Sequence, residues 1–97
     1  MLFMIVERFE NNDMVPVYRR LGEAGRGLPD GLTYVDSWVA ADFSRCFQLM
    51  ETEDAALFQQ WALHWCGTGA SFEIVPVTPS AAARAAVEAR IKAEDGA

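Results

Sequence analysis

His64 is the only histidine in the chain, which makes it the first candidate for acid–base chemistry. An imidazole gains or loses its proton near neutral pH, so it can serve as a general acid or base. In a segment with helical periodicity, Leu57, Phe58, Trp61 and Trp65 define an apolar arc that also contains His64. The spacing predicts that His64 faces a sheet. The alternative is a partly buried histidine that is hydrogen-bonded to a backbone carbonyl.

Asp36 is the second candidate, because it lies between Tyr34 and Trp38 in a segment rich in strand-forming residues. Aspartate is a poor strand former, so a carboxylate flanked by aromatic residues in a strand is unusual. It could act as a general base beside His64. The competing interpretation is that Asp36 pairs with an arginine or faces solvent at the sheet edge.

Aromatic residues are concentrated in the same two segments. Tyr34, Trp38, Trp61 and Trp65 occur at strand and helix spacings. Together they predict a flat aromatic pocket between helix and sheet that suits a planar organic ligand, with Gln48 lining it or an interface. Core packing is the alternative for each of them taken singly.

The sequence contains no recognisable set of metal ligands. It has one histidine and two isolated cysteines, Cys46 and Cys66, with no C-x-x-C or H-x-x-x-H spacing. We therefore expect no metal and no cofactor. Both thiols are expected to be reduced and buried as small hydrophobic residues.

Length and charge exclude several classes of partner. The chain has 97 residues, which allows one small domain, and 14 acidic against 8 basic residues give a net charge of −6. The basic residues are scattered, which argues against nucleic acid and anionic membrane surfaces as partners. No apolar run approaches the ~20 residues of a membrane span, and the opening residues lack a basic segment typical of a signal peptide. A cytoplasmic protein is expected.

Turn residues and hydrophobic spacing divide the chain into seven elements. In order, these are a strand at 2–9, a helix from about 14 that Gly25 and Gly27 end, strands at 32–39 and 45–52, a helix from about 53 to 66, a strand at 70–77, and an Ala-rich helix from Ser80. This predicts an α+β, ferredoxin-like βαββαβ domain over 1–78 with a four-stranded antiparallel sheet, followed by an extra C-terminal helix and tail over 79–97.

Both faces of the central hairpin carry apolar residues. A regular second strand would place Tyr34, Asp36 and Trp38 on one face, and the third strand divides into Phe47 and Leu49 against its even-numbered residues. A sheet with one exposed face should alternate cleanly between apolar and polar residues. We therefore expect helices on one face and a second copy of the protein on the other.

Four stretches carry a family resemblance. They are MLFMIVERF at 1–9, GLTYVDSWV at 31–39, RCFQLMET at 45–52 and FEIVPV at 72–77. Together they resemble a small bacterial family catalogued as domain of unknown function 3303, over about residues 1–78. The resemblance implies a dimeric α+β barrel, in which two ferredoxin-like units pair their sheets. It implies no catalytic residues, because the family has no assigned activity.

Three hypotheses for the function follow. The first is a homodimeric small-molecule-binding module with an aromatic pocket. The second is a cofactor-independent monooxygenase or isomerase that uses His64 and Asp36. The third is a structural or regulatory protein that associates through its sheet face. The first two predict a cavity near Trp38, Trp61 and His64.

Overall fold

The computed structural model describes residues 1–96 and contains the predicted order of elements. These are β1 (Leu2–Phe9), a 3-10 turn (Glu10–Asn12), α1 (Val15–Ala24), β2 (Thr33–Val39), β3 (Arg45–Glu51), α2 (Leu57–His64), β4 (Ala70–Val77) and α3 (Ser80–Asp95). The fold class is confirmed as α+β and ferredoxin-like with an additional C-terminal helix.

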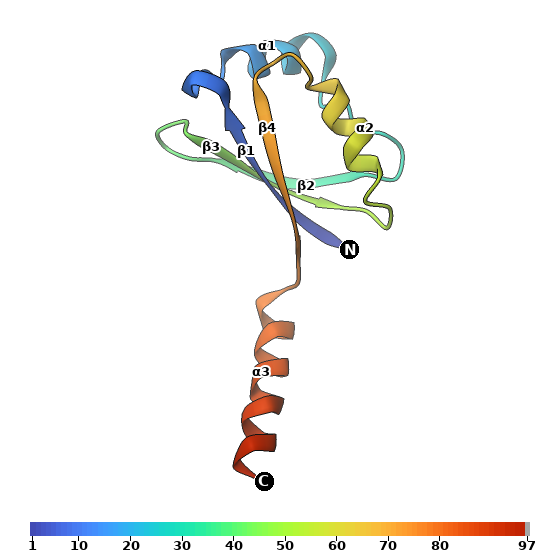
Figure 1. The fold of residues 1–97 in the computed structure, drawn as a ribbon. Helices are drawn as coiled ribbons and strands as arrows, with labels where there is room; N and C mark the ends of the chain where they lie inside the picture. Colours follow the sequence, from blue (N-terminus) through green and yellow to red (C-terminus); the bar gives the residue numbers. More distant parts are fainter. Residues whose placement is uncertain (97) are drawn as a thin grey trace.

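The four strands form one antiparallel sheet in the order β2-β3-β1-β4. Figure 1 shows α1 and α2 on the same side of this sheet, whereas α3 projects away from it. The domain consists of two βαβ units, β1-α1-β2 and β3-α2-β4, which the β2–β3 hairpin joins. In this arrangement β3 lies between the parallel strands β1 and β2.

Alternation along β1 determines which side of the sheet is covered. Phe3, Ile5, Glu7 and Phe9 are buried, and the residues between them are less so. The buried positions face the helices, because side chains alternate between the two faces of a strand. The core of the domain therefore lies between the sheet and the α1–α2 layer.

A β-bulge interrupts β2 and corrects the predicted faces. Tyr34 pairs with Met50 but Asp36 pairs with Leu49, so the register shifts by one residue between them. Tyr34 thus shares the helix-covered face with Ser37, whereas Asp36 and Trp38 lie on the other face. The prediction that Tyr34, Asp36 and Trp38 share one face is wrong, because an extra residue reverses the alternation.

The face without helices is apolar over much of its area. Its outward positions in the pairing register come from all four strands. The apolar ones are Leu2, Met4, Val6, Trp38, Phe47, Leu49, Val75 and Val77. We call this surface the open face.

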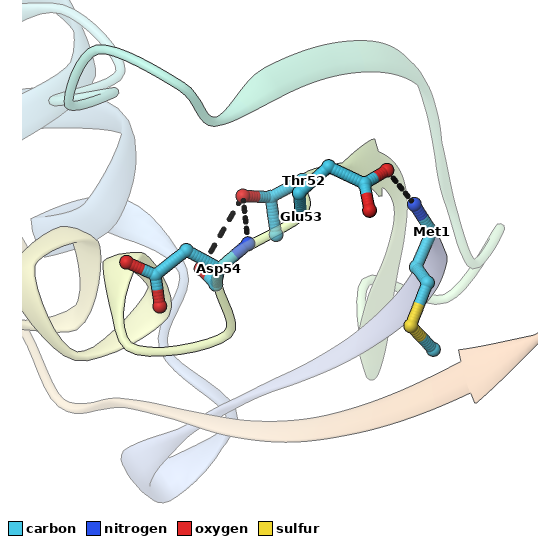
Figure 2. A network of polar contacts seen from close by, with 4 residues as sticks. All are labelled: Met1, Thr52, Glu53 and Asp54. Atoms are coloured by element: carbon cyan, nitrogen blue, oxygen red, sulfur yellow. Dashed lines mark hydrogen bonds and ion pairs between the residues drawn. The ribbon is translucent and has the colours of Figure 1, made fainter.

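The sequence predicts a helix from about residue 53, but α2 begins at Leu57 because Thr52–Asp54 form a turn. Thr52 Oγ1 accepts a hydrogen bond of 3.1 Å from the Asp54 amide (Figure 2). Asp54 Oδ1 accepts in turn from the Ala56 amide at 3.0 Å. Side chains that bond to nearby backbone in this way favour turns over helix. The same view shows the Met1 amino group 2.8 Å from Glu53, and this contact lowers the pKa of that carboxyl.

The C-terminal helix has no buried residue among those that the structure describes. Exposed pairs between Arg84 and Glu88 and between Arg90 and Glu94 stabilise it locally. Ala97, which belongs to the predicted tail, lies outside the described residues. Across residues 1–96, no helix combines the length and apolar character that crossing a membrane requires.

Candidate ligand-binding site

The inward positions of the two central strands change character along their length. The inward residues of β1 run from Phe3 and Ile5 to Glu7. The inward residues of β3 opposite them run from Met50 to Gln48 and Cys46, because the two strands are antiparallel. The register pairs Phe3 with Met50 and Glu7 with Cys46, so apolar residues gather at one end and polar residues at the other. The core therefore has two halves of different chemistry.

The polar half encloses a cavity of about 110 Å³ between α1 and the sheet. Its polar lining residues are Glu7, Tyr18, Arg26, Ser37, Cys46 and Gln48. Its apolar lining residues are Phe9, Val17, Leu21, Val39 and Trp65. Apolar walls with a few convergent polar groups are the usual composition of a small-molecule site.

Glu7 is the buried acid of this cavity, with only 4% of its surface exposed. Its Oε1 accepts a hydrogen bond of 3.2 Å from Gln48 Nε2. Burial raises the pKa of the Glu7 carboxyl, and hydrogen bonds from Cys46 and Gln48 partly oppose that shift. A carboxyl in this setting can accept or donate a hydrogen bond to a bound molecule.

The pKa values of Cys46 and Tyr18, which also line the cavity, are raised as well. Burial, with the nearby Glu7 carboxyl, raises the pKa of the Cys46 thiol to about 11. Burial also raises the pKa of the Tyr18 hydroxyl, and Cys46 and Glu7 add to that shift. Both groups are therefore protonated near neutral pH and present hydrogen-bond donors rather than nucleophiles. The expectation of two buried thiols fails for Cys66, which is exposed just past the end of α2, and Cys46 is half-buried.

Trp65 contributes an indole ring to the cavity wall and a buried N–H group that lacks a partner. The side chain is 6% exposed, and no acceptor reaches Nε1 among residues 1–96. Leaving a buried donor unsatisfied costs about 1–3 kcal/mol. Such groups are rare in folded proteins.

Arg26 is the exposed basic residue of the lining. Its guanidinium carbon lies 3.9 Å from the centre of the Tyr34 ring, and the Tyr34 hydroxyl shares a 2.6 Å hydrogen bond with Ser37 Oγ. The β2 bulge makes this contact possible, because residues 34 and 37 would face opposite sides of a regular strand. Bulges often orient side chains in this way beside functional sites.

His64 does not line this cavity. Its Nε2 donates to the Gly25 carbonyl at 2.9 Å, and its ring lies on Gly27, where a Cβ atom would come within 2.1 Å of Cγ. Arg20 donates in turn to the His64 carbonyl. These contacts join the end of α2 to the loop after α1, in keeping with a histidine bonded to a backbone carbonyl.

Asp36 lies on the other side of the sheet from His64. It is exposed on the open face, where its Oδ1 accepts from the Ser37 amide at 2.8 Å. The structure therefore does not bring the two predicted acid–base residues together.

The four aromatic residues of the predicted pocket are also divided. Trp61 is 1% exposed and packs against Phe72 at 4.5 Å, with its Nε1 donating to the Arg26 carbonyl at 3.1 Å. Trp38 is half-exposed on the open face. Of the predicted ligand-binding residues, only Gln48 and Trp65 line the cavity, and Tyr34 adjoins it through Arg26.

Glu7, Tyr18 and Arg26 are cavity residues that sequence reasoning did not select. The sequence pattern could have indicated that Glu7 is a buried acid, since it occupies an inward position in a strand whose other inward residues are apolar. Arg26 follows the end of α1 in a loop and has no periodic signal.

No group of three or more potential metal-binding side chains occurs in the part of the chain that the structure describes.

A model of the family described as Domain of unknown function (DUF3303) matches residues 1–91. The chain belongs to this family. The match continues past residue 78 into α3, beyond the four stretches that carry the resemblance. No curated protein and no solved structure matches the chain. Membership in DUF3303 supplies no activity, so the function of this member must be argued from its site.

Proposed function

We propose that this DUF3303 member is a homodimeric small-molecule-binding protein and that each subunit holds a small planar organic molecule in the cavity beneath α1. The observation that carries the proposal is a cavity lined by a buried carboxyl, Glu7, together with apolar and aromatic side chains that include Trp65. Burying a carboxyl is unfavourable for folding alone, and a bound molecule would give it a further hydrogen-bond partner.

Cavity size limits the ligand. A closed apolar cavity of about 150 Å³ is large enough to bind benzene. The space here is about 110 Å³ and is lined by the exposed residue Arg26, so it can extend to the surface. The space is smaller than the benzene-binding cavity, so a single ring fits only where it extends through the opening toward solvent. Tyr18 and Trp65 contribute aromatic side chains to the lining.

A fragment panel of monocyclic aromatic compounds tests the binding function. We expect some members to shift amide resonances of Glu7 and Gln48 and the indole resonance of Trp65 in ¹⁵N-labelled protein. Val39→Phe, which places a ring at the cavity wall, should weaken binding at least about tenfold. Val87→Phe on α3 is the matched control and should leave binding unchanged. The proposal fails if no fragment shifts these resonances, or if the two variants bind alike.

The open face supports the homodimeric part of the proposal. A large apolar surface on a sheet is commonly covered by another chain. Along β3 this face reads Arg45, Phe47, Leu49 and Glu51, with opposite charges at the two ends. Two copies paired with β3 antiparallel across a two-fold axis would bring Arg45 of one copy near Glu51 of the other. A second copy thus matches this surface in both charge and hydrophobicity.

Charge exchange tests this arrangement without altering the apolar centre. Arg45→Glu and Glu51→Arg should each weaken association, measured by sedimentation equilibrium, because each places like charges together. The double exchange should restore it. A wild-type protein that is monomeric at micromolar concentration, or a double variant as weak as the singles combined, would contradict the dimer.

Glu7 supports acid–base catalysis as a second candidate function in the same cavity. Its pKa is raised by burial, which is the direction expected for a carboxyl that exchanges protons near neutral pH. Glu7→Gln preserves the shape of the side chain and removes its titration. If bound compounds are converted to products that mass spectrometry detects, this variant should bind them and leave them unchanged. Equal turnover by both proteins would exclude Glu7 as the acid or base.

A further inference from the structure

The cavity has a buried acidic group and an exposed basic group. Glu7 is 4% exposed at the sheet, whereas Arg26 is exposed in the loop after α1. Among residues 1–96, no carboxylate lies within ion-pair distance of the Arg26 guanidinium. The cavity therefore offers an uncommitted cation at its solvent side and a hydrogen-bonding carboxyl inside.

Arg26 is held in place from two directions. Its carbonyl accepts from Trp61 Nε1 at 3.1 Å, which ties the loop to a fully buried side chain. Its guanidinium lies over the Tyr34 ring, which Ser37 fixes through the Tyr34 hydroxyl. A guanidinium stacked on an aromatic ring keeps its N–H groups free for paired hydrogen bonds to a carboxylate. The loss of side-chain freedom on binding is reduced accordingly.

We propose that the ligand is a small aromatic acid with a ring hydroxyl or amino group, its carboxylate bound to Arg26 and its donor group directed to Glu7. This inference rests on the proposed binding function and specifies its ligand class. The opposite orientation would place the ligand carboxylate beside Glu7, where like charges in a poorly solvated space repel. A neutral ring would make no charge-assisted hydrogen bond with Arg26.

Four probes separate the contributions of the two groups. We would titrate 3-hydroxybenzoate, 4-hydroxybenzoate, benzoate and phenol into ¹⁵N-labelled protein and follow the resonances of Glu7, Gln48 and Trp65. The better hydroxybenzoate should bind at least about tenfold more tightly than either benzoate or phenol. A tenfold ratio corresponds to about 1.4 kcal/mol, close to the lower end of what one hydrogen bond to a charged group contributes.

Arg26→Gln tests the anion contact directly. It should remove the advantage of hydroxybenzoate over phenol while phenol affinity stays the same, and Arg26→Lys should restore only part of it because an ammonium cannot form the paired contact. Arg19→Gln on α1 removes the same charge outside the cavity lining and should change nothing. Because Arg26 is exposed, its replacement should leave the folded spectrum intact.

The outcomes distinguish this inference from the function beneath it. If phenol binds the cavity as tightly as both hydroxybenzoates, or if Arg19→Gln weakens hydroxybenzoate as much as Arg26→Gln, the ligand class is wrong and small-molecule binding stands. If none of the four probes and no fragment of the wider panel shifts the cavity resonances, both proposals fall together.

Discussion

The two halves of the core use the same strands and differ in how they are filled. Beneath α2, Phe3 and Phe58 meet at 5.0 Å, Phe58 and Trp61 at 6.4 Å, and Ile5 and Met50 are fully buried. We call this the packed half. Beside α1, Glu7, Cys46, Gln48 and Trp65 surround a cavity of about 110 Å³. We call this the hollow half.

The difference indicates how this small domain separates stability from function. Close packing of aromatic rings supplies most of the free energy that an apolar core can give. The hollow half forgoes such contacts and buries polar groups whose burial is unfavourable. A domain of this size has little stability to spare, so the packed half must compensate for the hollow half.

The largest expected effect is in the packed half. Trp61→Ala should lower the free energy of unfolding by about 3–5 kcal/mol, because it removes a fully buried ring and its hydrogen bond to Arg26. Urea denaturation followed by circular dichroism measures the change. Leu63→Ala, on the same helix but 73% exposed, should change stability by less than about 0.5 kcal/mol. A Trp61→Ala effect as small as the control would show that the packed half is not the source of stability.

A matched pair of tryptophan variants compares the halves directly. Trp61→Phe removes an N–H that donates to Arg26, whereas Trp65→Phe removes an N–H without a partner. Both lose the same volume, so their difference isolates the hydrogen bond. Trp61→Phe should be less stable than Trp65→Phe by about 1–3 kcal/mol in urea titrations. Equal stabilities would mean that the Trp65 N–H is satisfied in solution.

The sequence predicts the order of the elements because two signals depend only on neighbouring residues. These are the hydrophobic periodicity within each element and the turn residues that end it. Residues 2–9 and 70–77 were expected as strands, and β1 and β4 have those bounds. The tertiary register is not local. The bulge after Tyr34 contains no glycine or proline that would indicate it in the sequence. It moves Asp36 and Trp38 to the opposite face of the sheet from Tyr34.

The candidate site was predictable only in part for the same reason. Gln48 and Trp65 were selected from their strand and helix faces, and both line the cavity. His64 is predicted to face the sheet, but its ring lies against the loop after α1, where the Gly25 carbonyl accepts from its Nε2. Arg26 enters the site through that same loop, whose path depends on contacts with Trp61 and Tyr34. Helical and strand periodicity carry no information about such contacts.

The next prediction concerns the pH dependence of the hollow half. Burial raises the pKa of Glu7 above its ordinary 4.5, so the folded state keeps this proton to higher pH than the unfolded chain does. Both states are protonated below the ordinary value. As the pH rises through the raised value, the stability that the neutral carboxyl provides is lost.

The amide side chain of the Glu7→Gln variant is neutral at every pH, so this variant does not lose stability in that way as the pH rises. The stability of the variant minus that of the wild type should therefore become more positive as the pH rises above 4.5, as measured by urea midpoints at a series of pH values. A constant difference would mean that Glu7 ionises alike in folded and unfolded chains. A difference of opposite slope would mean that its charged form is the stabilised one.

The smallest effect is expected from the thiol of the hollow half. Cys46→Ser replaces one weakly polar donor with another beside Glu7, so it should change the free energy of unfolding by less than about 1 kcal/mol. Met50→Ser, on the same face of β3 but fully buried in the packed half, should lower it by at least about 2 kcal/mol. The two positions share a strand and a face, and they differ in their surroundings and in the size of the side chain that serine replaces. If Cys46→Ser proved as destabilising as Met50→Ser, the hollow half would be an ordinary apolar core, and its polar residues would not mark a binding site.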